Sequence, residues 1–142
     1  MRRTSAVCGI LLLAAVTTAG AQTGSTTGTV HEIRLTRGEG EHTFGFVPAR
    51  VVARPGDVIL FRVVSGSPHS VVFELADMTT PADARLWTAA MPRRAAPLTS
   101  PIFVESGLEY AVVVPEVTPG RYRFYSLPKL AYDMRGEIEV RR

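Results

Sequence analysis

Cysteine is almost absent from this chain, since Cys8 is the only one among 142 residues. A single thiol excludes an internal disulfide, so a folded domain has to rely on its hydrophobic core. The sequence also lacks a Gly-x-Ser-x-Gly motif, paired histidines at metal-protease spacing, and a glycine-rich phosphate loop before a helix. These absences argue against the common hydrolase and nucleotide-binding chemistries, and we predict that the protein is not an enzyme.

A long apolar run is found only at the N-terminus. Arg2 and Arg3 precede an apolar stretch at residues 6–16, and Ala19-Gly20-Ala21 is a small-residue cleavage signal. The stretch is shorter than the roughly 20 residues that a membrane span needs. Residues 1–21 are therefore predicted to be a secretory signal peptide, with an uncleaved N-terminal anchor as the alternative. The expected location is periplasmic or secreted, with no membrane span after cleavage.

Cleavage would change both the charge and the thiol content. The net charge would fall from +3 to +1 because Arg2 and Arg3 leave, and Cys8 would leave with them. So small an excess of positive charge gives no reason to expect a nucleic-acid partner. The mature chain would have a flexible leader rich in Thr, Ser and Gly at residues 22–29. One domain follows at residues 30–142, with enough of the 46% hydrophobic content to form one core.

Within that domain the sequence predicts strands and one short helix. Two-residue alternation of apolar and polar side chains is typical of half-buried strands. It predicts strands over 30–36, 44–52, 58–64, 70–75, 102–104, 108–114, 120–126 and the segment after Met134. Thr80 is predicted to cap a helix that begins at Pro81, with Asp83 completing a capping box. Ala84, Trp87 and Met91 then recur at helical spacing and form one face.

The last two strands enclose a loop with a distinctive frame. Ser126-Leu-Pro-Lys-Leu-Ala-Tyr-Asp-Met134 resembles the closing motif of the plastocyanin-like cupredoxins, C-x-P-H-x-x-x-x-M. Pro128 and Met134 are in register with that motif. Ser126 stands where the family has its thiolate, and Lys129 stands where it has its second imidazole. The resemblance therefore supports the fold, whereas two of the four copper ligands are replaced.

An earlier loop carries the same resemblance. Pro68, His69, Val71 and Phe73 fit the family pattern Pro-His-x-Val-x-Phe, in which the imidazole is the first copper ligand. The similarity extends over residues 30–142. It implies an all-β fold, an antiparallel Greek-key β-sandwich of the cupredoxin type with one short inserted helix.

The surviving residues leave two interpretations of function. A type I copper site needs two imidazoles, a thiolate and a weak axial thioether. A serine hydroxyl is a poor ligand for a soft metal, and a lysine ammonium repels a cation. We therefore expect a binding or accessory domain without a cofactor. The alternative is an atypical copper-binding or electron-transfer protein that uses His69, Met134 and His42, since the loops that carry them are expected at one end of the sandwich. Each of the three also has a structural interpretation: hydrogen bonding for His69, packing for Met134, and solvation for His42.

Apolar side chains surround the lysine of the closing motif. Leu127, Pro128, Leu130 and Tyr132 could form a docking surface, as the corresponding patch does in the family, or they could cover the core. The docking interpretation predicts a partner protein of the cell envelope.

Overall fold

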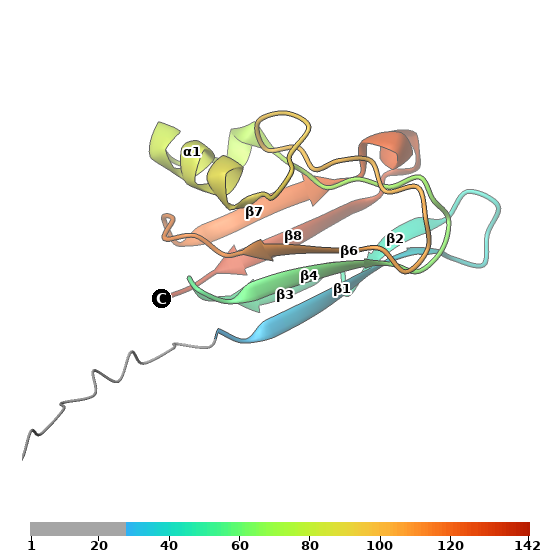
Figure 1. Cartoon of the computed structure of the whole chain (residues 1–142), viewed down its shortest axis with the longest axis horizontal. Helices are drawn as coiled ribbons and strands as arrows, with labels where there is room; N and C mark the ends of the chain where they lie inside the picture. Colours follow the sequence, from blue (N-terminus) through green and yellow to red (C-terminus); the bar gives the residue numbers. More distant parts are fainter. Residues whose placement is uncertain (1–27) are drawn as a thin grey trace, which may run out of the picture.

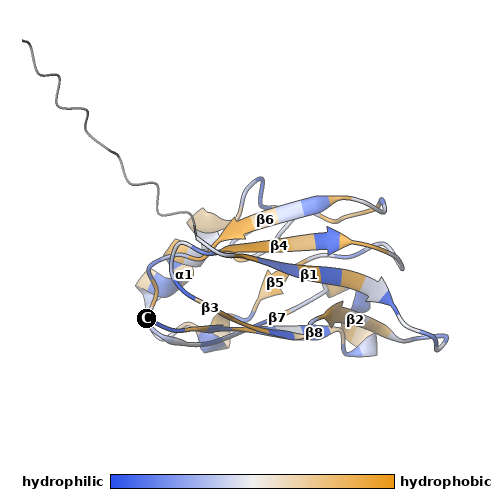
Figure 2. Cartoon of the chain, turned by 90° about the horizontal axis from the view of Figure 1, so that it is seen from below, coloured by the Kyte–Doolittle hydropathy of each residue, from blue (hydrophilic) through white to orange (hydrophobic). Residues whose placement is uncertain are grey.

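Two four-stranded sheets lie face to face in the computed structural model, which describes residues 28–142 (Figure 1). The predicted signal peptide lies outside the described residues, as do residues 22–27 of the predicted leader. The first sheet has the order β2 (Phe44–Val47), β1 (Val30–Arg37), β4 (Val58–Val63), β6 (Glu109–Val113). The second has the order β3 (Arg50–Ala53), β8 (Arg135–Val140), β7 (Gly120–Tyr125), β5 (Val72–Phe73). Figure 2 shows these two layers from their edge.

Alternation along the strands builds the core between the layers. On β1, Ile33 and Leu35 are buried while their neighbours face solvent, and Tyr122 and Phe124 do the same on β7. Phe124 meets Phe46 edge to face, with ring centroids 4.8 Å apart. Gly136 on β8 is required beside this ring, because a Cβ there would lie 2.4 Å from a Phe124 ring atom.

The sandwich and its inserted helix agree with prediction, but two strand pairings differ from the antiparallel expectation. β1 pairs with β4 and β3 pairs with β8 in parallel. The predicted strand over 44–52 is also two strands, β2 and β3, in different sheets. Pro48 lies between them and has no N–H to donate, so the ladder stops there and the chain crosses to the other sheet.

Two other predicted strands are shorter than expected. Of residues 70–75, only Val72–Phe73 forms β5, and Leu75–Asp77 turns into the 3-10 helix η1. Phe103 makes an isolated bridge to His69 rather than a strand over 102–104. A second 3-10 helix, η2 (Leu127–Tyr132), fills the loop between β7 and β8.

Helix α1 (Pro81–Ala90) begins as predicted. The Thr80 hydroxyl accepts a hydrogen bond from the Asp83 N–H, and the Asp83 carboxylate accepts one from the Thr80 N–H. This capping box satisfies two amides that the first helical turn leaves unpaired. Trp87 is fully buried and stacks on Phe73, with ring centroids 4.5 Å apart. Trp87 and Met91 therefore cover one flank of the core, as predicted, whereas Ala84 of the predicted face is only partly buried.

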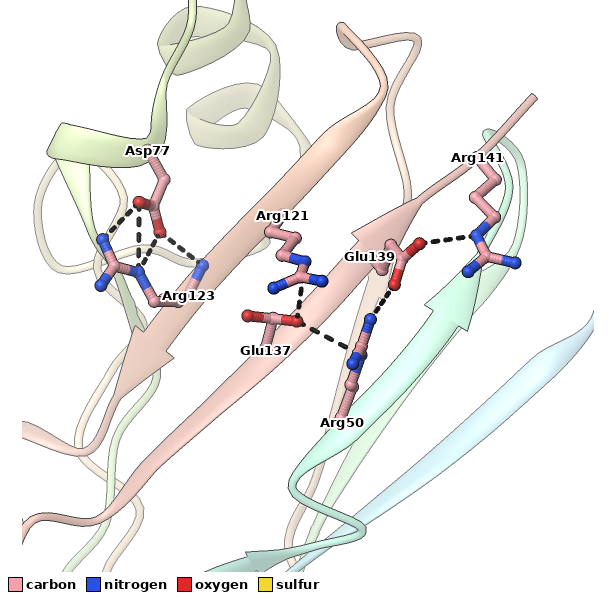
Figure 3. A network of polar contacts seen from close by, with 7 residues as sticks. All are labelled: Arg50, Asp77, Arg121, Arg123, Glu137, Glu139 and Arg141. Atoms are coloured by element: carbon pink, nitrogen blue, oxygen red, sulfur yellow. Dashed lines mark hydrogen bonds and ion pairs between the residues drawn. The ribbon is translucent and has the colours of Figure 1, made fainter.

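The outer face of the second sheet is charged and largely self-neutralised (Figure 3). Arg50 pairs with Glu137 and Glu139, and the guanidinium of Arg123 binds Asp77 through two nitrogens. Such exposed pairs add little stability each, but they keep the face hydrated and polar.

Two buried carboxyl groups make stability sensitive to acid. Burial by itself would raise the pKa of Asp57 and Asp83, but donated hydrogen bonds outweigh it and hold both below the ordinary value of 3.8. For Asp57 the donors include the amides of Arg54 and Thr29, and for Asp83 they include the amides of Thr118 and Thr80.

We therefore expect stability to fall as the pH drops below about 4. A folded-state pKa below the unfolded one means that the unfolded chain binds more protons in this range, which favours unfolding. Urea unfolding at pH 7 and pH 3 measures the effect, with a lower midpoint expected at pH 3. The double variant Asp57→Asn, Asp83→Asn should lose less of its stability over the same interval. Equal midpoints for the wild type at the two pH values would contradict the expectation.

Candidate functional site

Three loops meet at the end of the sandwich that carries η2 (Figure 1). The Arg37 N–H donates to the Ser65 hydroxyl at 2.9 Å, which joins the end of β1, where the first loop begins, to the loop after β4. His42, in the first of these loops, stacks on Tyr132 of η2 with ring centroids 5.2 Å apart. The predicted gathering of these loops at one end is therefore observed.

His69 is held rigidly at this end. Its backbone exchanges two hydrogen bonds with Phe103, at 3.0 and 2.8 Å, and its side chain is fully buried. Nε2 lies 2.7 Å from the Ser65 carbonyl oxygen. A carbonyl can only accept, so Nε2 carries the proton and Nδ1 has a free lone pair. Nδ1 is buried and has no hydrogen-bond partner within residues 28–142.

The environment keeps this imidazole neutral at pH 7. Burial lowers the pKa of His69, the hydrogen bond to Ser65 opposes that shift, and the positive charge of Lys129 lowers the pKa further. Nδ1 is thus a donor atom for a metal or an acceptor for a proton, without having first to lose a proton of its own.

Ser126 lies beside the segment that contains His69, as the resemblance implies, but its hydroxyl already takes part in a hydrogen bond. The Ser126 oxygen accepts a hydrogen bond from the Ser70 N–H at 3.1 Å, and the Ser70 oxygen accepts one from the Leu127 N–H at 3.0 Å. Ser70 and Ser126 are both fully buried. This reciprocal pair fastens the start of η2 to the residue that follows His69.

Lys129 and Met134 occupy the other end of the loop. The Lys129 ammonium lies 4.1 Å from the centre of the Phe44 ring, a cation–π contact. Phe44 in turn meets His69 edge to face, with ring centroids 6.4 Å apart. Met134 is buried, and its N–H and C=O both bond within the loop, to Lys129 and Ser126.

This set of donors does not fit type I copper. One free imidazole nitrogen and one thioether remain, while a hydrogen-bonded hydroxyl and a cation stand where a thiolate and a second imidazole are needed. Within the described part of the chain, no group of three or more His, Cys, Asp or Glu residues is placed to hold a metal ion.

The contacts do not join His42 to His69 directly. His42 is exposed and rests on Tyr132, and Tyr132 packs against Phe44 with ring centroids 5.1 Å apart. Phe44 then contacts His69. The two imidazoles therefore contact different members of an aromatic series, and a site formed by His42, His69 and Met134 remains a prediction.

The apolar residues of η2 point largely outward. Leu127, Leu130 and Tyr132 are 51%, 40% and 41% exposed, and Pro128 is half-buried. We call these four residues the η2 patch. Their exposure favours a surface over a cover for the core, and it leaves apolar side chains in contact with solvent.

Sequence reasoning did not single out Phe44 and Ser70, which organise this end. Phe44 contacts Lys129, His69 and Tyr132, and Ser70 forms the hydroxyl pair with Ser126. From the sequence, Phe44 was predicted only to belong to the strand over 44–52. Ser70 directly follows His69, and that position next to a ligand-loop histidine was the available signal.

The sandwich with a ligand-loop histidine and a terminal loop closed by a methionine defines a cupredoxin-like domain. A sequence model of copper binding proteins, plastocyanin/azurin family, matches residues 32–141. The chain belongs to this family. It is 30% identical over 125 residues to chloroplastic plastocyanin of Silene latifolia subsp. alba, covering 88% of this chain and 70% of that protein. It is also 29% identical over 104 residues to a plastocyanin minor isoform of Arabidopsis thaliana, covering 73% of this chain and 55% of that one.

Solved structures support the same fold. Oxidised plastocyanin from Dryopteris crassirhizoma superposes with a TM-score of 0.62 at 22% identity, covering 78% of this chain and all of that one. A mutant of amicyanin in its reduced Cu(I) form at pH 4 gives a TM-score of 0.51 at 17% identity, covering 80% of this chain and 82% of that one. No helix among residues 28–142 is long and apolar enough to cross a membrane.

Proposed function

We propose that this protein is an exported cupredoxin-like binding domain that has lost the type I copper site and recognises another envelope protein through the η2 patch. The proposal rests on the contacts that Ser126 and Lys129 make at the two altered ligand positions. The Ser126 hydroxyl joins the start of η2 to Ser70 by a hydrogen bond, and the Lys129 ammonium contacts the face of the Phe44 ring. Both polar groups stabilise the loop itself, and neither can replace a soft anionic or imidazole ligand.

The proposed loss of the type I copper site predicts a colourless protein. Without a thiolate, adding Cu(II) to the purified chain should give no intense visible absorption, because that colour comes from thiolate-to-copper charge transfer. Metal analysis of the protein as purified, together with a visible spectrum after Cu(II) addition, tests this. An intense absorption band with copper bound one to one would overturn the loss of the site.

The proposed recognition of another envelope protein is tested by a substitution that puts a charged side chain in the η2 patch. Leu130→Glu should abolish capture of an envelope partner, because a carboxylate in an apolar contact must be desolvated. Leu86→Glu is the matched control, since Leu86 is 39% exposed and lies on α1, and Leu130 is 40% exposed. A partner bound equally by both variants would place recognition elsewhere.

A second candidate function rests on the free nitrogen of His69. A buried imidazole with an unpaired Nδ1 could support weak metal binding together with Met134 and His42, with only pale colour when the metal is Cu(II). In that case His69→Ala should abolish copper binding and His42→Ala should weaken it. His31→Gln, at the other end of β1, is the control. Binding that survives His69→Ala would eliminate this candidate.

A further inference from the structure

Helix α1 lies away from the end that carries η2 (Figure 1). A groove runs along the exposed flank of this helix. One part of it is a pocket of about 340 Å³ between the helix, Leu75 of η1, and the loop that ends at Leu98. An adjoining pocket of about 360 Å³ shares Leu75 and Ala84 with the first and continues toward Met78 and Pro81. We call the two together the α1 groove. Their combined size is within the range of small-molecule sites, about 300–1,000 Å³.

The groove is open because small residues face it. Ala84 and Ala89 line the helical side, whereas the large Trp87 points into the core from the same helix. Leu75 lines both pockets and is 68% exposed. A ligand that covered this aliphatic side chain would remove apolar surface from water, which is favourable.

The opposite wall is a loop in an unusual conformation. Arg93 and Leu98 have positive φ angles of 48° and 57°, and neither is a glycine. Side-chain-bearing residues rarely adopt this region, and such conformations collect at functional sites. The loop is pinned, since the Leu98 carbonyl accepts from the Phe73 N–H at 2.9 Å and Ala95 bonds to Thr99 at 2.9 Å. The wall is thus preformed.

The charges at the groove lie at one end only. Arg85 and Arg94 line the 340 Å³ pocket, both are exposed, and neither belongs to any of the ion pairs formed within residues 28–142. Among the described residues, none with a charged side chain lines the adjoining 360 Å³ pocket. A ligand that matches this arrangement has an anionic head and an apolar tail.

We propose that the α1 groove binds a small amphipathic carboxylate. The tail would lie against Leu75 and Ala84 and extend toward Met78, while the carboxylate would accept hydrogen bonds from Arg85 and Arg94. A guanidinium presents paired N–H groups that match the two oxygens of a carboxylate. This proposal is independent of the η2 patch and of any metal.

Calorimetric titration of the purified chain with decanoate tests it. We expect saturable binding with a Kd below about 1 mM, and clearly weaker binding of the shorter hexanoate, because less apolar surface is covered. Ala89→Leu should weaken decanoate binding about tenfold by filling the pocket. Arg85→Gln and Arg94→Gln should each weaken it at least about threefold.

Matched controls make the result decisive. Ala82→Leu adds the same bulk to an exposed position on α1 outside the lining. Arg34→Gln removes an exposed arginine of β1 that forms no ion pair with another residue of 28–142, so both variants should leave the Kd unchanged. Decyltrimethylammonium, with the same tail and the opposite charge, should bind far more weakly. The proposal is overturned if decanoate does not saturate, if the cation binds as tightly, or if the controls lose as much affinity as the groove variants.

Discussion

Asp83→Ala is expected to lower the free energy of unfolding by about 3 kcal/mol, the combined effect of a lost helix cap and of partly buried amides left without an acceptor. Asp83 is only 3% exposed. Its two oxygens accept from the Thr80 N–H at 3.0 Å and from the Thr118 N–H at 3.0 Å. One carboxylate thus joins the start of α1 to the loop before β7, and its removal affects both.

Chemical denaturation of the variant and of two comparison proteins measures this effect. Asp83→Asn keeps one acceptor oxygen and should lose less stability than Asp83→Ala. Glu116→Ala removes an exposed carboxylate two residues before Thr118 and should change stability by no more than about 0.5 kcal/mol. If Asp83→Ala proves no more destabilising than Glu116→Ala, the carboxylate does not hold the helix to the sheet.

The parts of the fold that local chemistry determines could be predicted from the sequence. The alternation that predicted strands over 30–36 and 120–126 agrees with the burial of Ile33, Leu35, Tyr122 and Phe124, and the capping box predicted the start of α1. The crossing at Pro48 and the two parallel pairings could not be predicted in the same way. These features depend on which distant strand each segment pairs with. The alternation along a single strand does not specify that partner.

The sequence predicted which residues occupy the ligand positions of the candidate site, but it did not predict the side-chain contacts that they make. The spacing from Ser126 to Met134 put Ser126, Lys129 and Met134 at three of the four ligand positions, and Ser126 does lie against the residue that follows His69, the fourth. The sequence could not show that Phe44, from another strand, would form a cation–π contact with the Lys129 ammonium. Nor could it show that Tyr132 would stack on His42. Such contacts are formed by loops that meet only when the sandwich closes.

The double variant Ser126→Cys, Lys129→His is expected to turn a colourless protein into one with intense visible absorption when Cu(II) is added. It would supply the thiolate and the second imidazole that complete a type I set with His69 and Met134. His69 already offers a buried nitrogen without a partner, and Met134 is already buried in the loop. Replacing Lys129 also removes a positive charge that acts on His69.

The expected stability cost is larger than for an exposed loop. Ser126 is fully buried, and its oxygen accepts from the Ser70 N–H. A cysteine sulfur is a weaker acceptor, so we expect the double variant to lose about 1 kcal/mol before copper is added. Copper binding to the folded state should then raise its thermal midpoint above its metal-free value.

Visible absorption, copper content and thermal unfolding should be measured on the same samples. Each single variant should remain colourless or much paler, because a thiolate without the second imidazole leaves the metal open to water. Adding His69→Ala to the double variant should abolish the colour. A double variant that folds and still binds no copper would mean that the loop has diverged in shape as well as in chemistry. Ser126 and Lys129 would then no longer correspond to the ligand positions of the family, because a correct register supplies all four donors at one end of the sandwich.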